Sequence, residues 1–162
     1  MKRPFWFPRP LAARLARLLA LGLACAASTG AARADPLAEQ GKALFGTHCA
    51  ACHNADASGI AGVAPPLAGA LRERLASPAD QAYLANVLTH GLAGPIQSQG
   101  QSFNGIMPSF ATLPDESLAA VLSWLAASNG VPEQAVSTAT LAGARTERKT
   151  PGAVRKLREA GQ

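Results

Sequence analysis

Five consecutive residues constrain this chain more than any other feature, and they read Cys49-Ala50-Ala51-Cys52-His53. The pattern Cys-x-x-Cys-His predicts covalent attachment of a c-type haem. Two thiols add to the two vinyl groups on one porphyrin edge only if the chain between them turns tightly, which small residues allow. The histidine follows directly, so its imidazole lies beneath the iron as the proximal ligand. With three Cys and three His in 162 residues, random placement gives the pattern in about one chain in a thousand.

Three other interpretations of the motif are less favoured. A structural zinc site needs four ligands, usually with a second Cys or His pair, whereas only His48 and His90 remain and they are not spaced as a pair. A thioredoxin-like redox pair follows a strand in a βαβ unit, whereas the residues before Cys49 have helical periodicity. An inert disulfide between Cys49 and Cys52 is the plainest alternative.

The first 34 residues have the organisation of a secretory signal peptide. Basic residues come first, a short apolar run covers residues 18–27, and residues 32–34 read Ala-Arg-Ala, which a signal peptidase can recognise. We therefore expect cleavage before Asp35 and export to the periplasm. The apolar run is too short to span a bilayer; a retained anchor and a lipoprotein signal at Cys25 are the alternatives.

Removal of this signal changes the charge of the protein. The full chain has a formal net charge of +5. Six of its fifteen basic residues and none of its ten acidic residues lie in the signal, so the mature chain has a net charge of −1. A net charge close to zero does not indicate nucleic-acid binding. Export also implies an oxidising compartment, in which Cys49 and Cys52 are the only cysteines of the mature chain.

The mature chain has helical periodicity and no recognisable strand alternation, so we predict an all-α fold. Gly41 lies inside the first helix and suggests close packing by another element. Residues 91–108 contain four glycines and two prolines and are predicted to be a loop. The helices are expected over residues 35–48, 67–75, 77–90 and 114–129.

The chain is predicted to have three parts: the signal (1–34), a haem domain (35–132) and a basic tail (133–162). The tail has six basic and three acidic residues, whereas the domain has three basic and seven acidic. This composition favours a solvated or partly ordered tail. A docking segment, for a partner or for the acidic face of the domain itself, is the functional alternative.

The sixth ligand of the iron has few candidates. Once Met1 leaves with the signal, Met107 is the only methionine of the mature chain. A lone methionine usually fills a core, but its loop position, before the stiffening Pro108 and downstream of a haem motif, favours a ligand. His90 is the rival, better explained as a solvated residue at a helix end. His48 is committed to the helix that leads into the motif.

Several segments resemble the class I cytochromes c, in particular small bacterial members with one haem. Trp124 corresponds to an aromatic residue of the last helix that packs in this family against the glycine of the first helix. The resemblance covers about residues 37–130. It rests on Gly41-x-x-x-Phe45-x-x-x-Cys49-x-x-Cys52-His53, on Pro65-Pro66-Leu67, on residues 90–108 and on residues 121–125.

The resemblance implies a compact fold of about four helices around one haem. In it His53 and Met107 are the axial ligands, and the carbonyl of Pro65, or of the adjacent Pro66, accepts a hydrogen bond from the histidine. Phe103 stands where the family usually has tyrosine, so a hydroxyl contact is missing. The haem-binding residues that it implies are Cys49, Cys52, His53, Pro65, Leu67 and Met107.

Ligation by histidine and methionine leaves no open site on the iron, and the chain has no second catalytic constellation. We therefore expect a periplasmic one-electron carrier, not an enzyme. Its partners would be a dehydrogenase donor and an oxidase or reductase acceptor, met through weak contacts, with no stable membrane insertion. A haem enzyme or sensor with an open sixth site, and a haem-free interaction module, are the alternatives. Apolar loop residues that could contact partners are Ala57, Ile60, Ala61 and Val63.

Overall fold

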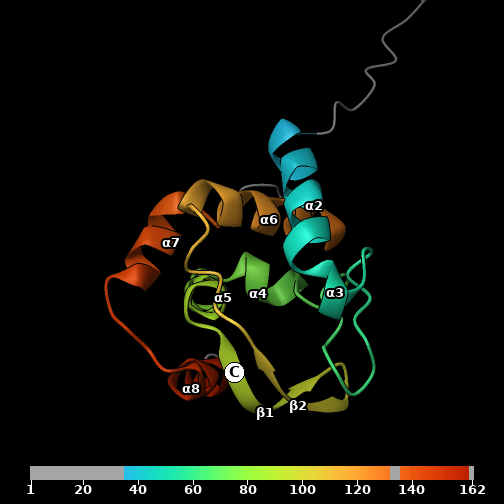
Figure 1. Cartoon of the computed structure of the whole chain (residues 1–162), viewed down its shortest axis with the longest axis vertical. Helices are drawn as coiled ribbons and strands as arrows, with labels where there is room; N and C mark the ends of the chain where they lie inside the picture. Colours follow the sequence, from blue (N-terminus) through green and yellow to red (C-terminus); the bar gives the residue numbers. More distant parts are fainter. Residues whose placement is uncertain (1–34, 132–135, 161–162) are drawn as a thin grey trace, which may run out of the picture. The chain divides into compact units, whose positions relative to one another are not determined.

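The computed structural model describes residues 35–131 and 136–160, and these are mostly helical. The described ranges contain seven helices, whereas the sequence predicted about four. None of these seven helices is long and apolar enough to cross a bilayer. The predicted signal, residues 1–34, lies outside these ranges. The elements are α2 (Pro36–His48), α3 (Ala50–His53), α4 (Arg72–Ala76), α5 (Pro78–His90), β1 (Leu92–Ser98), β2 (Gln101–Met107), α6 (Asp115–Ser128), α7 (Thr138–Arg145) and α8 (Pro151–Ala160) (Figure 1).

Local capping chemistry starts two of the longer helices where the sequence predicted. Asp35 caps α2, and its carboxylate accepts a hydrogen bond of 2.8 Å from the backbone N–H of Leu37. The Ser77 side chain accepts from the backbone N–H of Asp80 and caps α5. Both helices have proline in their first turn, where its missing N–H is not needed. The predictions for residues 35–48 and 77–90 are confirmed.

Helices α2 and α6 cross in close contact at Gly41 (Figure 1). A Cβ atom built on Gly41 would lie only 1.8 Å from the carbonyl oxygen of Ala120, so only glycine permits this approach. Beside the crossing, the rings of Phe45 and Trp124 are 4.5 Å apart between centroids. The expected close packing at Gly41 is thereby confirmed.

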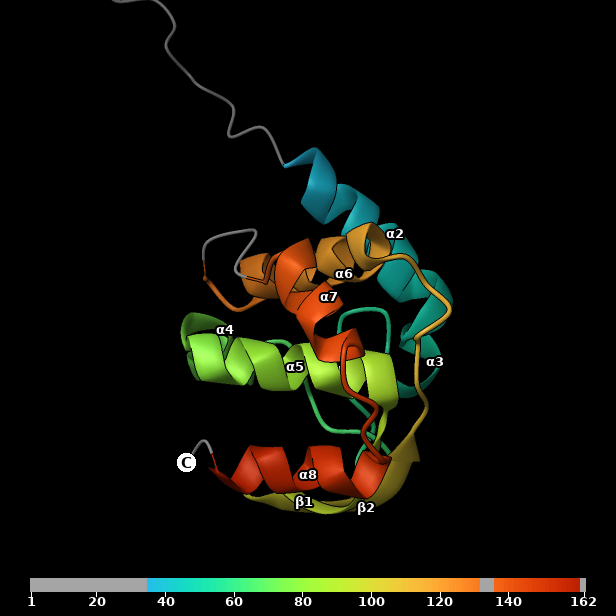
Figure 2. The same ribbon diagram turned by 90° about the vertical axis from the view of Figure 1, so that its left-hand side faces the viewer.

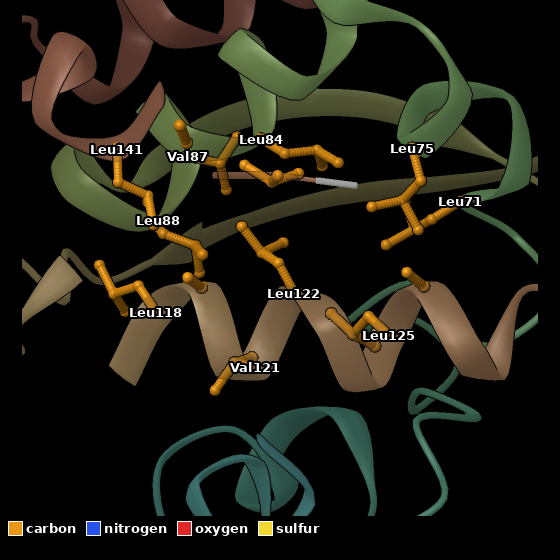
Figure 3. Close-up of a cluster of buried hydrophobic side chains, with 14 of the residues drawn as sticks. Leu71, Leu75, Leu84, Val87, Leu88, Leu118, Val121, Leu122, Leu125 and Leu141 are labelled. Atoms are coloured by element: carbon orange, nitrogen blue, oxygen red, sulfur yellow. The ribbon is translucent and has the colours of Figure 1, made fainter. Parts of the chain in front are cut away.

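Helix α6 is the centre of the core because it is buried on two sides. Leu118 and Leu122 point towards α5, whereas Val121 points towards α2 (Figure 3). Leu71 and Leu75 extend the same cluster at the other end of α6 (Figure 3). The aliphatic residues of α6 thus join the N-terminal helix to the layer of α4 and α5.

The predicted all-α class is wrong for residues 92–107, which form an antiparallel hairpin of β1 and β2. Its turn is Gln99-Gly100, and both residues have positive φ, 51° and 73°, as a two-residue hairpin turn requires. The sequence lacks the alternation of apolar and polar residues that predicts a strand. The reason is that Gly94 and Gly105 occupy paired positions on the face where apolar side chains would be expected.

Residues 136–160 differ from a solvated tail, because α7 and α8 pack on the domain. Leu141 of α7 and Val154 of α8 are fully buried. Helix α7 contacts α5 and α6, and α8 lies along β1 and α5 (Figure 2). Arg145 pairs with Asp115 at 2.7 Å and donates to two backbone carbonyls of the segment before α6. Each helix thus buries only one or two aliphatic side chains, too few for a clear sequence pattern.

Candidate functional site

One large, mostly apolar cavity lies between α3, α5 and the hairpin. Its lining combines residues from distant parts of the chain, between His48 and Arg158. All six residues expected at the haem line this one cavity. They are Cys49, Cys52, His53, Pro65, Leu67 and Met107.

The motif folds as a single helical turn. The backbone N–H groups of Cys52 and His53 both donate to the carbonyl oxygen of Cys49, at 3.1 and 3.0 Å. Residues three and four positions apart share a helix face, so the thiols and the imidazole are presented to the same cavity. This is the geometry that the spacing of the motif predicted.

Both thiols are free, with Cys49 half-buried and Cys52 exposed. Burial, with a smaller effect of Cys52, raises the pKa of the Cys49 thiol to about 11. The described residues contain no cluster of three His, Cys, Asp or Glu side chains able to hold a metal ion. Nor does any strand of the described chain precede Cys49, as a thioredoxin-like site requires.

His53 is held in one orientation and one protonation state. Its side chain is 6% exposed, and its Nδ1 lies 2.9 Å from the carbonyl oxygen of Pro65, not of Pro66. A carbonyl only accepts, so Nδ1 carries the hydrogen and Nε2 keeps its lone pair. Burial lowers the pKa of His53, against the opposing effect of the Pro65 hydrogen bond. The neutral imidazole therefore has one nitrogen available for a metal.

The loop after the motif is tied to it by backbone hydrogen bonds. The N–H of Gly59 donates to the carbonyl oxygen of His53 at 2.9 Å, and the carbonyl of Ala57 accepts from Leu67 and Ala68. Ala57 is fully buried by these contacts, so its expected role as a surface contact is wrong. The closed loop brings Leu67 to the cavity wall.

The hairpin supplies the opposite wall through one of its faces. Three register pairs, Leu92 with Met107, Gly94 with Gly105 and Ile96 with Phe103, all line the cavity. They alternate along both strands, as residues on one face of a pleated ribbon must. Met107, expected in a loop, is therefore the last residue of β2 with its side chain on the cavity face.

The backbone around Met107 is fixed by a close contact. Gly91 has φ +78°, and a Cβ there would lie 2.6 Å from the carbonyl oxygen of Met107. Of the two rival histidines, His90 is not among the lining residues, and its Nδ1 lies 2.9 Å from Oγ1 of Thr89. His48 reaches the cavity but is exposed.

A group of three larger polar side chains in the cavity was not identified from the sequence. Arg74 of α4, Tyr83 of α5 and Arg158 of α8 all line it. Phe103, where tyrosine was expected, is 3% exposed and lines it as well. No local motif marks the two arginines, because each reaches the cavity through packing between helices far apart in the chain.

This site fits a covalently held haem. It offers two thiols three positions apart on one helical turn, a neutral imidazole with a free nitrogen, a thioether on the facing wall and a mostly apolar lining. A helical domain with such a site has the properties of a monohaem cytochrome c.

The comparisons with known proteins agree with this class. The family model of cytochrome c matches residues 38–129, and the chain belongs to this family. Membership implies a c-type haem attached covalently, for which Cys49 and Cys52 have the required spacing. The match ends before α7 and α8.

Two relatives from Thermus thermophilus are similar over the same region. The chain is 45% identical over 94 residues to one cytochrome c-552, and the alignment covers 58% of this chain and 64% of that protein. It is 48% identical over 82 residues to another cytochrome c-552, covering 51% of this chain and 63% of that protein. The chain thus spans slightly less than two thirds of these relatives.

Proposed function

We propose that this protein is a periplasmic one-electron carrier whose haem iron is ligated by His53 and Met107. The observation that carries the proposal is that one apolar cavity is lined by the Cys-x-x-Cys-His turn on one wall and by Met107 on the facing hairpin. The bound haem supplies the one-electron couple of its iron. Family membership and similarity to two cytochromes c-552 support the same function.

Residues of the chain would hold the iron from two sides when haem is bound. The hydrogen bond from His53 Nδ1 to the Pro65 carbonyl orients the ring and leaves Nε2 as the nitrogen that would bind the iron. On the other wall, the backbone of Gly91 packs closely against the carbonyl of Met107. Two fixed ligands fit electron transfer better than catalysis, because neither oxidation state needs rearrangement and no coordination position is open to substrate.

Electron exchange would take place at an apolar rim of the cavity. Val63 is 59% exposed and Ile106 is 81% exposed, and both line the cavity. A Cβ on Gly105 would be 3.5 Å from the carbonyl oxygen of Val63, so the loop and β2 adjoin there. Such a small apolar surface suits weak, short-lived contacts with a dehydrogenase donor and an oxidase or reductase acceptor.

The ligand assignment is tested with the absorption spectrum of the ferric protein. The wild type should show the charge-transfer band from methionine sulfur to iron, and Met107→Ala should lose it. Ile106→Ala is the matched control, because it changes the adjacent, 81% exposed residue of the same strand and should keep the band. A wild type that lacks the band, or whose ferrous form binds carbon monoxide readily, would favour the enzyme or sensor alternative.

Export and haem attachment are tested together by the mass of the protein recovered from the periplasm. The expected species begins at Asp35 and carries the mass of one haem. A product that keeps residues 1–34, or is processed at Cys25, would contradict the proposed cleavage site. A haem-free product with two cysteines joined as a disulfide would contradict the proposed function.

A further inference from the structure

A polar cluster closes one end of the otherwise apolar cavity. The guanidinium of Arg74 lies over the ring of Tyr83, 5.2 Å from its centroid, and Nη1 of Arg158 is 3.5 Å from the Tyr83 hydroxyl. Tyr83 is 4% exposed, and all three side chains line the cavity. Figure 2 shows that α4, which carries Arg74, and α3, which carries the haem motif, lie towards opposite ends of α5. The cluster and the cysteines therefore lie at different ends of the site.

The two arginines differ in how their charge is balanced. Arg74 forms an ion pair with Asp80. Arg158 donates to the backbone carbonyl of Gln97 at 2.6 Å and to the Tyr83 hydroxyl, which are both neutral. Among the described residues no carboxylate pairs with it, and the neighbouring Glu159 is paired with Arg155. A half-buried guanidinium without a counter-charge is costly beside an apolar cavity, so the ligand of the cavity should carry an anion there.

Helix α8 is positioned so that this guanidinium must face the cavity. Val154 is fully buried, and Arg158 follows it by four residues on the same helix face. Gly94 of β1 leaves room for the helix, since a Cβ there would lie 3.2 Å from Nε of Arg155. The orientation of Arg158 is thus determined by packing.

Haem has a matching polarity: two vinyl groups that bond to the cysteines on one edge, and two carboxylates of its propionate chains on the opposite edge. We propose that Arg158, together with the hydroxyl of Tyr83, binds a haem propionate carboxylate. Helix α8, which lies beyond the region matched by the family model, is then part of the cofactor site. This inference rests on the proposed function, because it requires the haem to be attached.

The test compares haem-loaded Arg158→Gln with haem-loaded Lys156→Gln. Lys156 is exposed on the same helix, so its substitution makes the same change in net charge away from the cavity. The readout is the reduction potential as a function of pH. The pKa of the carboxylate should rise without the nearby positive charge, and an ionised carboxylate stabilises ferric iron, so the potential falls as the pH rises through that pKa.

In Arg158→Gln we expect the fall of the reduction potential to occur at a pH at least about one unit higher than in the wild type. In Lys156→Gln we expect it at the same pH as in the wild type. Arg158→Lys keeps the positive charge and should restore the profile of the wild type. An unchanged profile in Arg158→Gln, or an equal movement in Lys156→Gln, overturns the inference. The nearby carboxylate of Asp80 is paired with Arg74, which none of these variants changes. Asp80 therefore does not account for a difference between their pH profiles.

If Arg158→Gln does not fold, Tyr83→Phe replaces it, because only the hydroxyl is removed. A smaller movement to higher pH supports the inference, and an unchanged profile overturns it. The mass of each purified variant is measured first. A protein without attached haem would contradict the proposed function itself, and this result is distinct from a haem-loaded protein whose profile fails to move.

Discussion

Replacing Gly41 by alanine should force α2 away from α6. The new Cβ would lie 1.8 Å from the carbonyl oxygen of Ala120 and 2.5 Å from its carbonyl carbon, whereas real Cβ atoms essentially never approach within 3.0 Å. The obstacle is backbone and cannot rotate aside, so α2 must move by about 1.2 Å. This movement also loosens the contact between Phe45 and Trp124, whose rings are 4.5 Å apart between centroids.

The expected decrease in the free energy of unfolding of Gly41→Ala follows from two opposing effects. Overpacking a well-packed interior costs about 1–3 kcal/mol, occasionally more, and the better helix propensity of alanine returns about 1 kcal/mol. Because backbone atoms block the new methyl group, we expect Gly41→Ala to lower the free energy of unfolding by about 2 kcal/mol. Gly46→Ala in the same helix is the matched control. Its Cβ meets nothing within 4 Å, so stability should rise by about 0.5–1 kcal/mol.

Both variants are measured as haem-loaded proteins by urea unfolding, followed by far-ultraviolet circular dichroism. The haem absorbance is recorded in parallel, since loss of haem contacts would show there. The reasoning fails if Gly41→Ala is as stable as Gly46→Ala, because α2 and α6 then do not approach as closely as the structure indicates.

Three further substitutions test other parts of the domain by the same unfolding measurement. Asn129→Leu removes the acceptor of the buried Leu71 N–H, at 2.8 Å, and should cost about 1–3 kcal/mol; no loss would mean that this bond is not formed. Leu141→Ala truncates a fully buried side chain of α7 and should lower the free energy of unfolding by about 2–5 kcal/mol. If this segment were solvated, the substitution would leave the free energy of unfolding almost unchanged. Arg145→Ala breaks the pair with Asp115 and should cost about 1–2 kcal/mol, less at high salt.

Local chemistry made much of the site predictable. The motif at Cys49 determines a turn within five residues, and the helix starts at Asp35 and Ser77 depend on caps and prolines adjacent to them. Met107 was chosen as the candidate ligand by elimination, since it is the only methionine after residue 34. The turn and the helix starts are predictable because each depends on residues a few positions apart in the chain.

The hairpin and the C-terminal helices could not be predicted in the same way. In β1 the cavity-facing position between Leu92 and Ile96 is Gly94, and Pro95 follows it, so the strand has neither alternation nor typical composition. Arg158 donates a hydrogen bond to the carbonyl of Gln97, which is 61 positions away. Such a contact follows only from the packing of whole elements, which no short window of sequence contains.

The cavity takes its lining from residues 48 to 158, and this has a consequence for the order of assembly. Its walls meet only after chain segments about a hundred positions apart have come together. Cys49 is half-buried once they have met, and its thiol is then poorly accessible. Attachment to the cysteines is therefore expected before the hairpin and α8 close over the site.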